Sequence, residues 1–236
     1  MRPLNQYTHI FFDMDGTVTR SRTRITAPMK QMLDSLTASG RDVIIISGAD
    51  AGQIKNQVTD ITGFFLAQNG NHAVRTPEGA MLWEENLTER ERVEIMTHIR
   101  TLPHFDVEDE HDLVHDRGSQ IAYSFIGHNE AIEKKEAFDP GGKKRAGMLN
   151  MHPLVSDTVE VKIGGTTTLD YFKKGRHKGF NVMRLVAYEG WVKEDCLYIG
   201  DALFLGGNDE AVIGVIDTLQ VKNPEETAKR IEEVLQ

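Results

Sequence analysis

The chain has 236 residues, of which 39% are hydrophobic and 27% are charged, and its formal net charge is −9. This length suffices for one large domain or for a core with a smaller insert, and the composition is that of an ordinary globular protein. The acidic balance argues against a general nucleic-acid-binding protein, which needs a surplus of Lys and Arg. An anionic substrate stays open, because a local basic pocket can lie in an acidic protein.

Cys196 is the only cysteine, so the chain cannot form an internal disulfide. This favours a reducing, cytoplasmic setting. We find no apolar run of about 18 residues that could span a membrane, and no secretory leader. We therefore expect a cytoplasmic protein that binds neither membranes nor nucleic acid.

The first part of the chain alternates strand and helix signals. The expected order is a strand at 9–12, a helix at 26–40, a strand at 42–47, a helix at 51–59 and a strand at 64–67. Thr26 is placed to cap the first helix, Pro28 suits its first turn, and Gly40 can end it. The strand at 42–47 is apolar without alternation, which is typical of a parallel strand covered on both faces. This order predicts a parallel sheet with right-handed crossovers.

After residue 70 the pattern changes. We expect a hairpin at 72–83, a helix at 88–100, strands at 112–115 and 120–126, charged helices within 129–151 and a second hairpin at 158–172. Thr88 and Glu91 have the spacing of a capping box, and Gly164-Gly165 marks the second hairpin turn. The basic run from Lys143 to Arg145 is interpreted as a solvated face. Residues 82–172 are thus predicted to form an inserted α+β domain.

The parallel pattern then returns. We expect a helix at 178–190, strands at 196–200 and 214–218, and a closing helix at 224–236. Residues 1–81 and 173–236 are therefore predicted to form one α/β core with a Rossmann-like, doubly wound parallel sheet.

Polar residues gather where the core strands are expected to end, and doubly wound folds bind ligands at that edge. They are Asp13 and Asp15, Ser47 and Gly48, Lys178 at a helix start, and Asp201 with Asn208 and Asp209. Taken singly, each group has an ordinary explanation as a turn, a helix cap or a solvated loop. Taken together at one sheet edge, they favour a site for phosphoryl transfer.

The chemistry starts from Asp13, which can attack phosphorus and carry a covalent aspartyl-phosphate. A carboxylate that approaches a phosphate needs a cation between the like charges. Oxygen ligands from Asp13, Asp201 and the backbone carbonyl of Asp15 suit Mg²⁺. The Asp15 side chain is then available as general acid and base.

The other polar residues complete this hypothesis. Ser47 and the amides near Gly48 can hold phosphate oxygens, and Lys178 supplies a fixed positive charge. Asn208 and Asp209 are predicted to orient Lys178 or the metal site with its waters.

Four stretches, "DMDGT" at 13–17, "SGAD" at 47–50, "HKG" at 177–179 and "GD…ND" at 200–209, resemble the four motifs of the haloacid dehalogenase-like (HAD) superfamily. The order core, α+β insert, core resembles subclass IIB, whose C2-type cap follows the third strand. Within it the chain is most similar to the eukaryotic-type phosphomannomutases. The similarity rests on six residues between Asp201 and Asn208, on "QNG" at 68–70 and on "KIGGTTTLDYFKKGRHK" at 162–178. The resemblance implies an HAD core with an inserted cap.

The resemblance also implies substrate contacts. Arg22 and Arg117 match arginines with which the family grips phosphate and sugar, His128 and Lys135 stand at two further family arginines, and Thr168 and Asp170 match contacts to sugar hydroxyls. It further implies a small phosphorylated sugar as substrate and a homodimer formed through the cap.

Three functions remain open. Hydrolysis of a small phosphorylated sugar is preferred, because two of the family's phosphate-gripping arginines are replaced and Arg is not interchangeable with Lys in planar phosphate recognition. A phosphomannomutase that interconverts mannose 1-phosphate and mannose 6-phosphate is favoured by the spacing after Asp201 and by Asp170. A non-catalytic binding protein with this fold is least favoured, because every chemical side chain is present.

Overall fold

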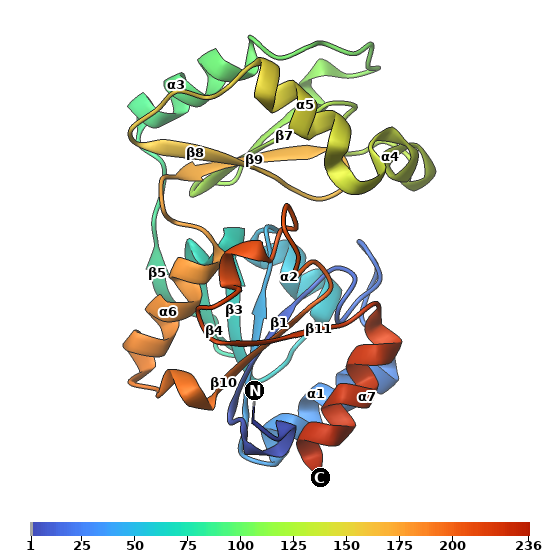
Figure 1. The fold of residues 1–236 in the computed structure, drawn as a ribbon, viewed down its shortest axis with the longest axis vertical. Coiled ribbons are helices and arrows are strands. Elements are labelled where there is room, and N and C mark those ends of the chain that lie inside the picture. The colour runs from blue at the N-terminus through green and yellow to red at the C-terminus, as the bar shows by residue number, and fades with distance from the viewer. Residues whose placement is uncertain (1) are drawn as a thin grey trace. The chain divides into compact units, whose positions relative to one another are not determined.

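The structure is a computed structural model that describes residues 2–236 (Figure 1). The chain divides into two compact units. Unit 1 holds the residues up to Glu84 and those from His177 onward, and unit 2 is Glu85–Arg176. The sequence predicted an insert at 82–172. Unit 2 begins three residues later than this and ends four residues later.

Unit 1 is built on a seven-stranded sheet in the order β11-β10-β1-β2-β3-β4-β5. Its strands are β1 His9–Asp13, β2 Asp42–Ile46, β3 Gly63–Ala67, β4 His72–Thr76, β5 Ala80–Glu84, β10 Cys196–Gly200 and β11 Asp217–Gln220. The five strands from β11 to β3 pair with one another in parallel, whereas β4 pairs antiparallel with both β3 and β5 at one edge. The predicted parallel sheet is confirmed.

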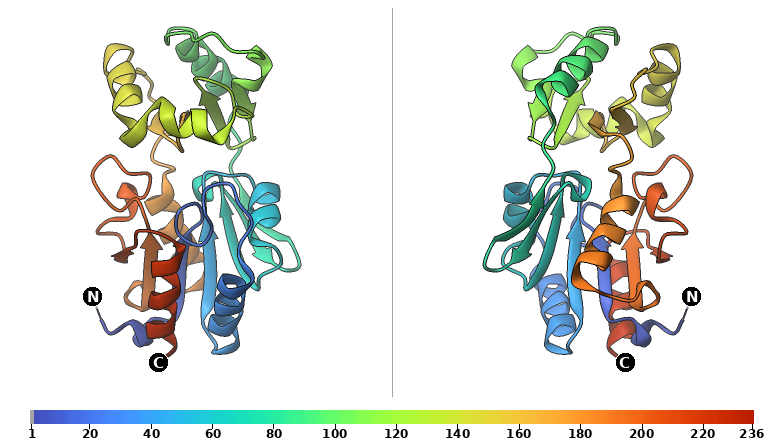
Figure 2. Two further views of the ribbon diagram at one scale, coloured as in Figure 1. Left: turned by 90° about the vertical axis from the view of Figure 1, so that its right-hand side faces the viewer. Right: turned by 90° about the vertical axis from the view of Figure 1, so that its left-hand side faces the viewer.

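Helices cover both faces of this sheet, which makes it doubly wound (Figures 1 and 2). They are α1 Ala27–Ala38, α2 Ala51–Val58, α6 Lys178–Glu189 and α7 Pro224–Leu235. Apolar side chains of α1, α2 and α7 pack with Ile10, Phe12 and Ile45 on one face. Those of α6 pack with Phe11 and Ile44 on the other. Adjacent strand residues point to opposite faces, so burial on both sides explains the unbroken apolar runs.

The last strand lies later than expected. A strand was predicted at 214–218, but β11 begins at Asp217. Gly214 has a φ of +80° and Val215 N donates to the Val212 carbonyl at 3.0 Å, so the chain still turns at this point. Ile216 is nevertheless buried with the α6 side chains. Val215 and Ile216 are therefore apolar because they pack against other side chains from within a turn, and not because they belong to a strand.

Unit 2 has a four-stranded antiparallel sheet in the order β6-β7-β9-β8. Its elements are α3 Glu89–Ile99, β6 Val114–Asp116, β7 Gln120–Ser124, α4 Ile132–Phe138, α5 Lys143–Met151, β8 Val159–Ile163 and β9 Thr168–Lys173. Side chains of α3 and α5, among them Ile95 and Met148, pack with Tyr123, Leu169 and Tyr171 of the sheet. This cluster is the core of unit 2.

Short 3₁₀ helices complete the fold. They are η1 Leu4–Gln6, η2 Gln68–Gly70, η3 Glu110–Asp112, η4 Pro140–Gly142, η5 Lys193–Asp195 and η6 Glu210–Val212.

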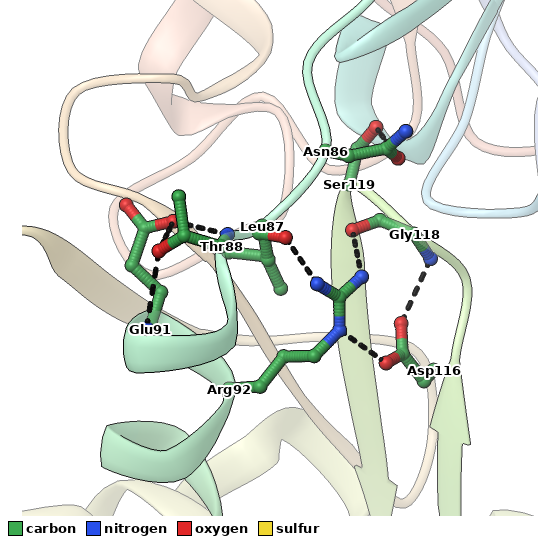
Figure 3. A network of polar contacts seen from close by, with 8 residues as sticks. All are labelled: Asn86, Leu87, Thr88, Glu91, Arg92, Asp116, Gly118 and Ser119. Atoms are coloured by element: carbon green, nitrogen blue, oxygen red, sulfur yellow. Dashed lines mark hydrogen bonds and ion pairs between the residues drawn. The ribbon is translucent and has the colours of Figure 1, made fainter.

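The start of α3 shows the predicted capping box (Figure 3). Thr88 Oγ1 accepts a hydrogen bond from the Glu91 amide at 3.3 Å, and the Glu91 carboxylate accepts one from the Thr88 amide at 2.7 Å. These two bonds satisfy amides that a helix N-terminus otherwise leaves without partners.

One turn further along α3, Arg92 ties the helix to the turn between β6 and β7 (Figure 3). Its guanidinium donates to the Asp116 carboxylate at 2.7 Å and to the Gly118 carbonyl at 3.1 Å, and also to the Leu87 carbonyl. Arg117 lies in this turn, so its backbone is held on both sides.

Cys196 lies buried in β10, and burial raises the pKa of its thiol to about 12. Within residues 2–236, no helix is both long enough and apolar enough to cross a membrane.

Candidate active site

The parallel register brings the predicted polar residues of unit 1 to one edge of the sheet. Asp13 is the last residue of β1 and lies opposite Ile46, so Ser47 follows immediately beside it. On the other side, Phe12 lies opposite Ile199 of β10. Asp201 therefore leaves β10 at the same edge. Parallel strands that end together are what collect these side chains.

Three carboxylates form an acidic cluster at this edge, namely Asp13, Asp201 and Asp209, with one oxygen from each lying within 4.8 Å of the others. Lys178, the first residue of α6, joins it. Its Nζ donates to Asp13 Oδ1 at 2.6 Å and to Asp209 Oδ1 at 2.7 Å. Asp13 is 3% exposed, Lys178 2% and Asp209 0%, so these charges lie almost entirely out of water.

The cluster carries more negative than positive charge. Burial raises the pKa of Asp13 well above its ordinary value, and the charges of Asp209 and Asp201 add to this effect while Lys178 opposes it. Burial and the charge of Asp209 raise the pKa of Asp201 to about 6. Burial alone lowers the pKa of Lys178, but Asp13 and Asp209 together raise it above its ordinary value. Lys178 therefore stays charged, whereas Asp13 and Asp201 hold their protons more tightly than ordinary carboxyls do.

These residues fit a divalent cation. Three carboxyl groups surround a single ammonium, so once their protons are displaced the cluster has two uncompensated negative charges, the number that one divalent cation neutralises. Asp13 Oδ2 is buried and has no hydrogen-bond partner among the described residues, which leaves it ready for a ligand. The donors are carboxylate oxygens, the kind that Mg²⁺ prefers. Asp13, Asp201 and Asp209 are thus the side chains that could hold the ion, while Asn208 lies exposed beside Asp209.

Asp15 takes a different place from Asp13. Its Oδ1 accepts a hydrogen bond from the Arg22 amide at 2.7 Å, within the turn that follows β1. Burial raises the pKa of Asp15, although the Arg22 amide opposes this effect. Gly16 makes the turn possible, because its φ is +84° and a Cβ there would lie 2.6 Å from Asp201 Oδ2. The turn thus brings Asp201 against the chain next to Asp15.

Ser47 lies buried directly after β2. Its amide donates to the Leu66 carbonyl at 3.1 Å, and its Oγ accepts from the Ala49 amide at 3.1 Å. Gly48 follows it in the loop before α2. The hydroxyl of Ser47 thus has a fixed position, with its proton directed away from the Ala49 amide.

The remaining predicted residues lie in unit 2. Arg117 lies in the β6–β7 turn, where its amide donates to the Gln120 carbonyl at 2.8 Å. Thr168 and Asp170 both belong to β9, and they alternate with Leu169, which faces the core. Thr168 and Asp170 therefore share the opposite face of the sheet. Their role in substrate binding stays a prediction.

His128 and Lys135 are buried. The Lys135 ammonium donates to the His128 carbonyl. His128 Nε2 lies 3.1 Å from the Ala122 carbonyl oxygen, and its ring stacks on His115 with 3.8 Å between centroids. Burial lowers the pKa of His128 to about 4, and the ring is therefore neutral at pH 7. It does not replace the charge of an arginine, and its contact with substrate also stays a prediction.

Sequence reasoning missed two residues. Tyr198 of β10 donates from its hydroxyl to Asp209 Oδ1 at 2.6 Å. A tyrosine in the apolar run "CLYIG", two residues before Gly200, was the available signal. Arg145 was interpreted as solvated, which is wrong, because it is 2% exposed and pairs with Asp139 at 2.8 Å. The sequence signal for this ion pair was Asp139, which stands six positions before Arg145 and precedes helix α5.

Comparison with known proteins agrees with this architecture. Residues 10–139 match the family described as haloacid dehalogenase-like hydrolase. A phosphomannomutase of Encephalitozoon cuniculi is 28% identical, covering 98% of this chain and 94% of that protein. The structure of SMU.1108c from Streptococcus mutans UA159 matches with a TM-score of 0.69 at 16% identity, covering 97% of this chain and 99% of that one. A haloacid dehalogenase-like hydrolase from B. subtilis matches with a TM-score of 0.67 at 13% identity, covering 95% and 99%. The predicted fold class is confirmed.

Proposed function

Since the chain belongs to the haloacid dehalogenase-like hydrolase family, we propose that it hydrolyses a small phosphorylated sugar through an aspartyl-phosphate on Asp13. One observation supports this most directly. Asp13 has one oxygen held by Lys178 and a second, buried oxygen without a partner among the described residues, beside two further carboxylates. That is the arrangement of a carboxylate prepared to meet phosphorus and a cation together.

The reaction takes place in two displacements. In the first, an Asp13 oxygen attacks phosphorus, the bond from phosphorus to the sugar oxygen breaks, and Asp15 gives that oxygen a proton. In the second, Asp15 takes a proton from water, the water oxygen attacks phosphorus, and the bond to Asp13 breaks. Inorganic phosphate leaves and both carboxyl groups regain their starting states. The Arg22 amide holds Asp15 in the turn for both proton transfers.

Other residues of unit 1 counter the charge of the phosphate. Lys178 keeps its ammonium beside Asp13, and Ser47 presents a hydroxyl at the same sheet edge, where each can hold a phosphate oxygen. Asp13 and Asp201 are proposed to hold Mg²⁺ with the Asp15 carbonyl, and Asn208 and Asp209 to support it. When bound, the ion shields the negative charges that must approach one another.

Substrate recognition is proposed to involve Arg22 at the phosphate, with Gly48 offering backbone amide contact. The residues of unit 2 proposed to bind substrate are Arg117, His128, Lys135, Thr168 and Asp170. Thr168 and Asp170 share a sheet face and can hydrogen-bond sugar hydroxyls. A neutral His128 supports hydrolysis as the first choice, because a mutase must anchor a second phosphate at this end.

A phosphomannomutase is the second candidate. The phosphomannomutase of Encephalitozoon cuniculi, similar over nearly the full length of both chains, supports it. In this reaction the phosphate on Asp13 would pass to a sugar hydroxyl instead of to water. Homodimerisation through unit 2 belongs to this proposal, and sedimentation of the purified protein would test it.

One assay separates the candidates. The pure protein is incubated with Mg²⁺, mannose 1-phosphate and a trace of hexose 1,6-bisphosphate. Free phosphate with little isomer supports hydrolysis, and mannose 6-phosphate without free phosphate supports the mutase. A wider screen of hexose, pentose and glycerate phosphates identifies the substrate.

Two variants test the covalent step. Asp13→Asn should abolish either activity and the transfer of radiolabelled phosphate to the protein. Asp34→Asn, the same change at an exposed position on α1, is the matched control and should retain both. Full turnover by Asp13→Asn would show that the covalent mechanism is wrong.

A further inference from the structure

Tyr198 ends a chain of hydrogen bonds that leads to Asp13. Its hydroxyl donates to Asp209 Oδ1 at 2.6 Å, and the same oxygen accepts from Lys178 Nζ at 2.7 Å. Lys178 Nζ in turn donates to Asp13 Oδ1 at 2.6 Å. Tyr198 is 0% exposed, and its ring is packed with Phe11, Val182 and the α6 side chains. The hydroxyl is thus fixed by its ring at one end of the chain.

The backbone of β10 is arranged so that this contact can form. Tyr198 and Gly200 are two residues apart and so lie on the same face of the strand. A Cβ on Gly200 would lie 2.4 Å from Asp209 Oδ2 and 2.8 Å from a ring carbon of Tyr198. The missing side chain therefore makes room for the Asp209 carboxylate beside the tyrosine.

The two oxygens of Asp209 have different surroundings. Oδ1 accepts two short, strong hydrogen bonds, from an ammonium and from a phenol. Among residues 2–236, Oδ2 accepts only the Ala202 amide, at 3.4 Å. Without the phenol, the carboxylate is free to turn about its last torsion, and Lys178 can follow it away from Asp13. With the phenol, one oxygen is fully engaged and the other is left for a cation or its water.

We propose that Tyr198 is a positioning residue, whose hydroxyl fixes Asp209 so that Oδ1 holds Lys178 against Asp13 and Oδ2 serves the cation site. The expected effect of Tyr198 on turnover rests on the proposed function. Its expected effect on cation binding is independent of that function. Tyr198 acts on Asp13 indirectly, through Asp209 and Lys178, and touches neither substrate nor phosphorus.

The test removes a single oxygen atom. Tyr198→Phe should raise the dissociation constant for Mg²⁺, measured by titration calorimetry without substrate, about tenfold, as for other residues that support a metal ligand. It should lower kcat on the screened sugar phosphate by a similar factor and leave KM within about twofold.

Tyr7→Phe is the matched control. Tyr7 is also 0% exposed in unit 1, and its hydroxyl also donates to a carboxylate, that of Asp217 at 2.5 Å. The control loses the same kind of bond at the far end of the strands. It should be destabilised to a similar extent and keep the wild-type Mg²⁺ affinity, kcat and KM.

A double-mutant cycle adds a second measurement. In an Asp209→Ala background, Tyr198→Phe should have almost no further effect on Mg²⁺ affinity, because the side chain that accepts the Tyr198 hydrogen bond is already gone. Independent, additive losses would overturn the proposal. So would wild-type Mg²⁺ affinity in Tyr198→Phe, or failure of that variant alone to fold. A wild-type protein inactive on every phosphate would refute the proposed function, while the calorimetry would still decide the role of Tyr198.

Discussion

Replacing Arg145 by methionine should destabilise unit 2 strongly, although its two neighbours in the basic run are exposed. Arg145 Nε contacts Asp139 Oδ2 at 2.8 Å, and both residues are buried. Its Nη1 donates to the carbonyls of Gly165 and Thr168, each at 3.0 Å, and also to that of Gly164. The one guanidinium therefore joins the start of α5 to the turn between β8 and β9.

The loss in free energy of unfolding depends on how the Asp139 carboxylate is compensated once the guanidinium is removed. Removing one partner of a buried ion pair costs about 3–5 kcal/mol, because the other charge stays buried without compensation. Asp139 keeps hydrogen bonds from the amides of Lys144 at 2.8 Å and residue 145 at 3.0 Å. We therefore expect the lower end of the range, about 3 kcal/mol. Lys143→Met, the same change at an exposed neighbour, should stay within about 0.5 kcal/mol of wild type.

Urea unfolding followed by two signals measures this difference. Both tryptophans, Trp83 and Trp191, belong to unit 1, so their fluorescence reports that unit, whereas far-ultraviolet circular dichroism reports both. Arg145→Met should move the dichroism transition to lower urea and the fluorescence transition much less. Equal midpoints for Arg145→Met and Lys143→Met would refute the reasoning.

The pH dependence gives a second check on this pair. Burial by itself raises the pKa of Asp139, but the hydrogen bonds from Arg145 and the two amides outweigh it and lower the pKa. The stabilisation is therefore present above the ordinary pKa of Asp and is lost as the pH falls through the lowered value. The deficit of Arg145→Met should accordingly shrink only in strong acid.

Four further outcomes are expected. The dissociation constant for Mg²⁺ should rise about tenfold from pH 7 to pH 5. The ion must displace a proton from the cluster, and the folded pKa of Asp201 is raised to about 6. Calorimetry at the two pH values checks this prediction, and an unchanged dissociation constant would contradict it. In EDTA, thermal melts should show the metal-free protein losing stability as the pH rises from about 4 to about 7, because the folded state binds that proton more tightly than the unfolded state does. Lys178→Met should lower kcat by at least about a hundredfold in the phosphate-release assay, since a buried, fixed positive charge is lost beside Asp13; wild-type kcat would show that the ammonium is not used. Thr88→Ala should cost unit 2 about 1 kcal/mol in the dichroism-detected urea transition, through loss of the capping box on α3, and an unshifted midpoint would show that Glu91 alone suffices as the cap.

Local patterns predicted most of the fold. The apolar run before Asp13, the capping box at Thr88 and the glycine that follows α1 are each fixed by bonds or packing within a few residues. Such signals also placed Asp13, Ser47 and Lys178 at the ends of their elements. The rule that parallel strands end at one edge then predicted that these residues gather.

The same reasoning failed where one pattern permits two environments. Arg145 and Lys143 belong to one basic run, yet one is buried in an ion pair and the other faces solvent. Val215 and Ile216 had the apolarity of a strand but lie in a turn that packs under α6. Sequence spacing describes a residue's own element, and it carries no information about which side chain approaches from another element.

The amino-acid sequence alone thus determined the doubly wound core, the α+β insert and the gathering of Asp13, Lys178 and Asp201 at one sheet edge. Only the tertiary structure decided their partners. Asp13 and Lys178 are 165 positions apart and meet at 2.6 Å, and the phenol of Tyr198 joins them through Asp209. Burial and charge pairing are properties of the assembled chain, because they depend on what water is excluded when distant segments come into contact.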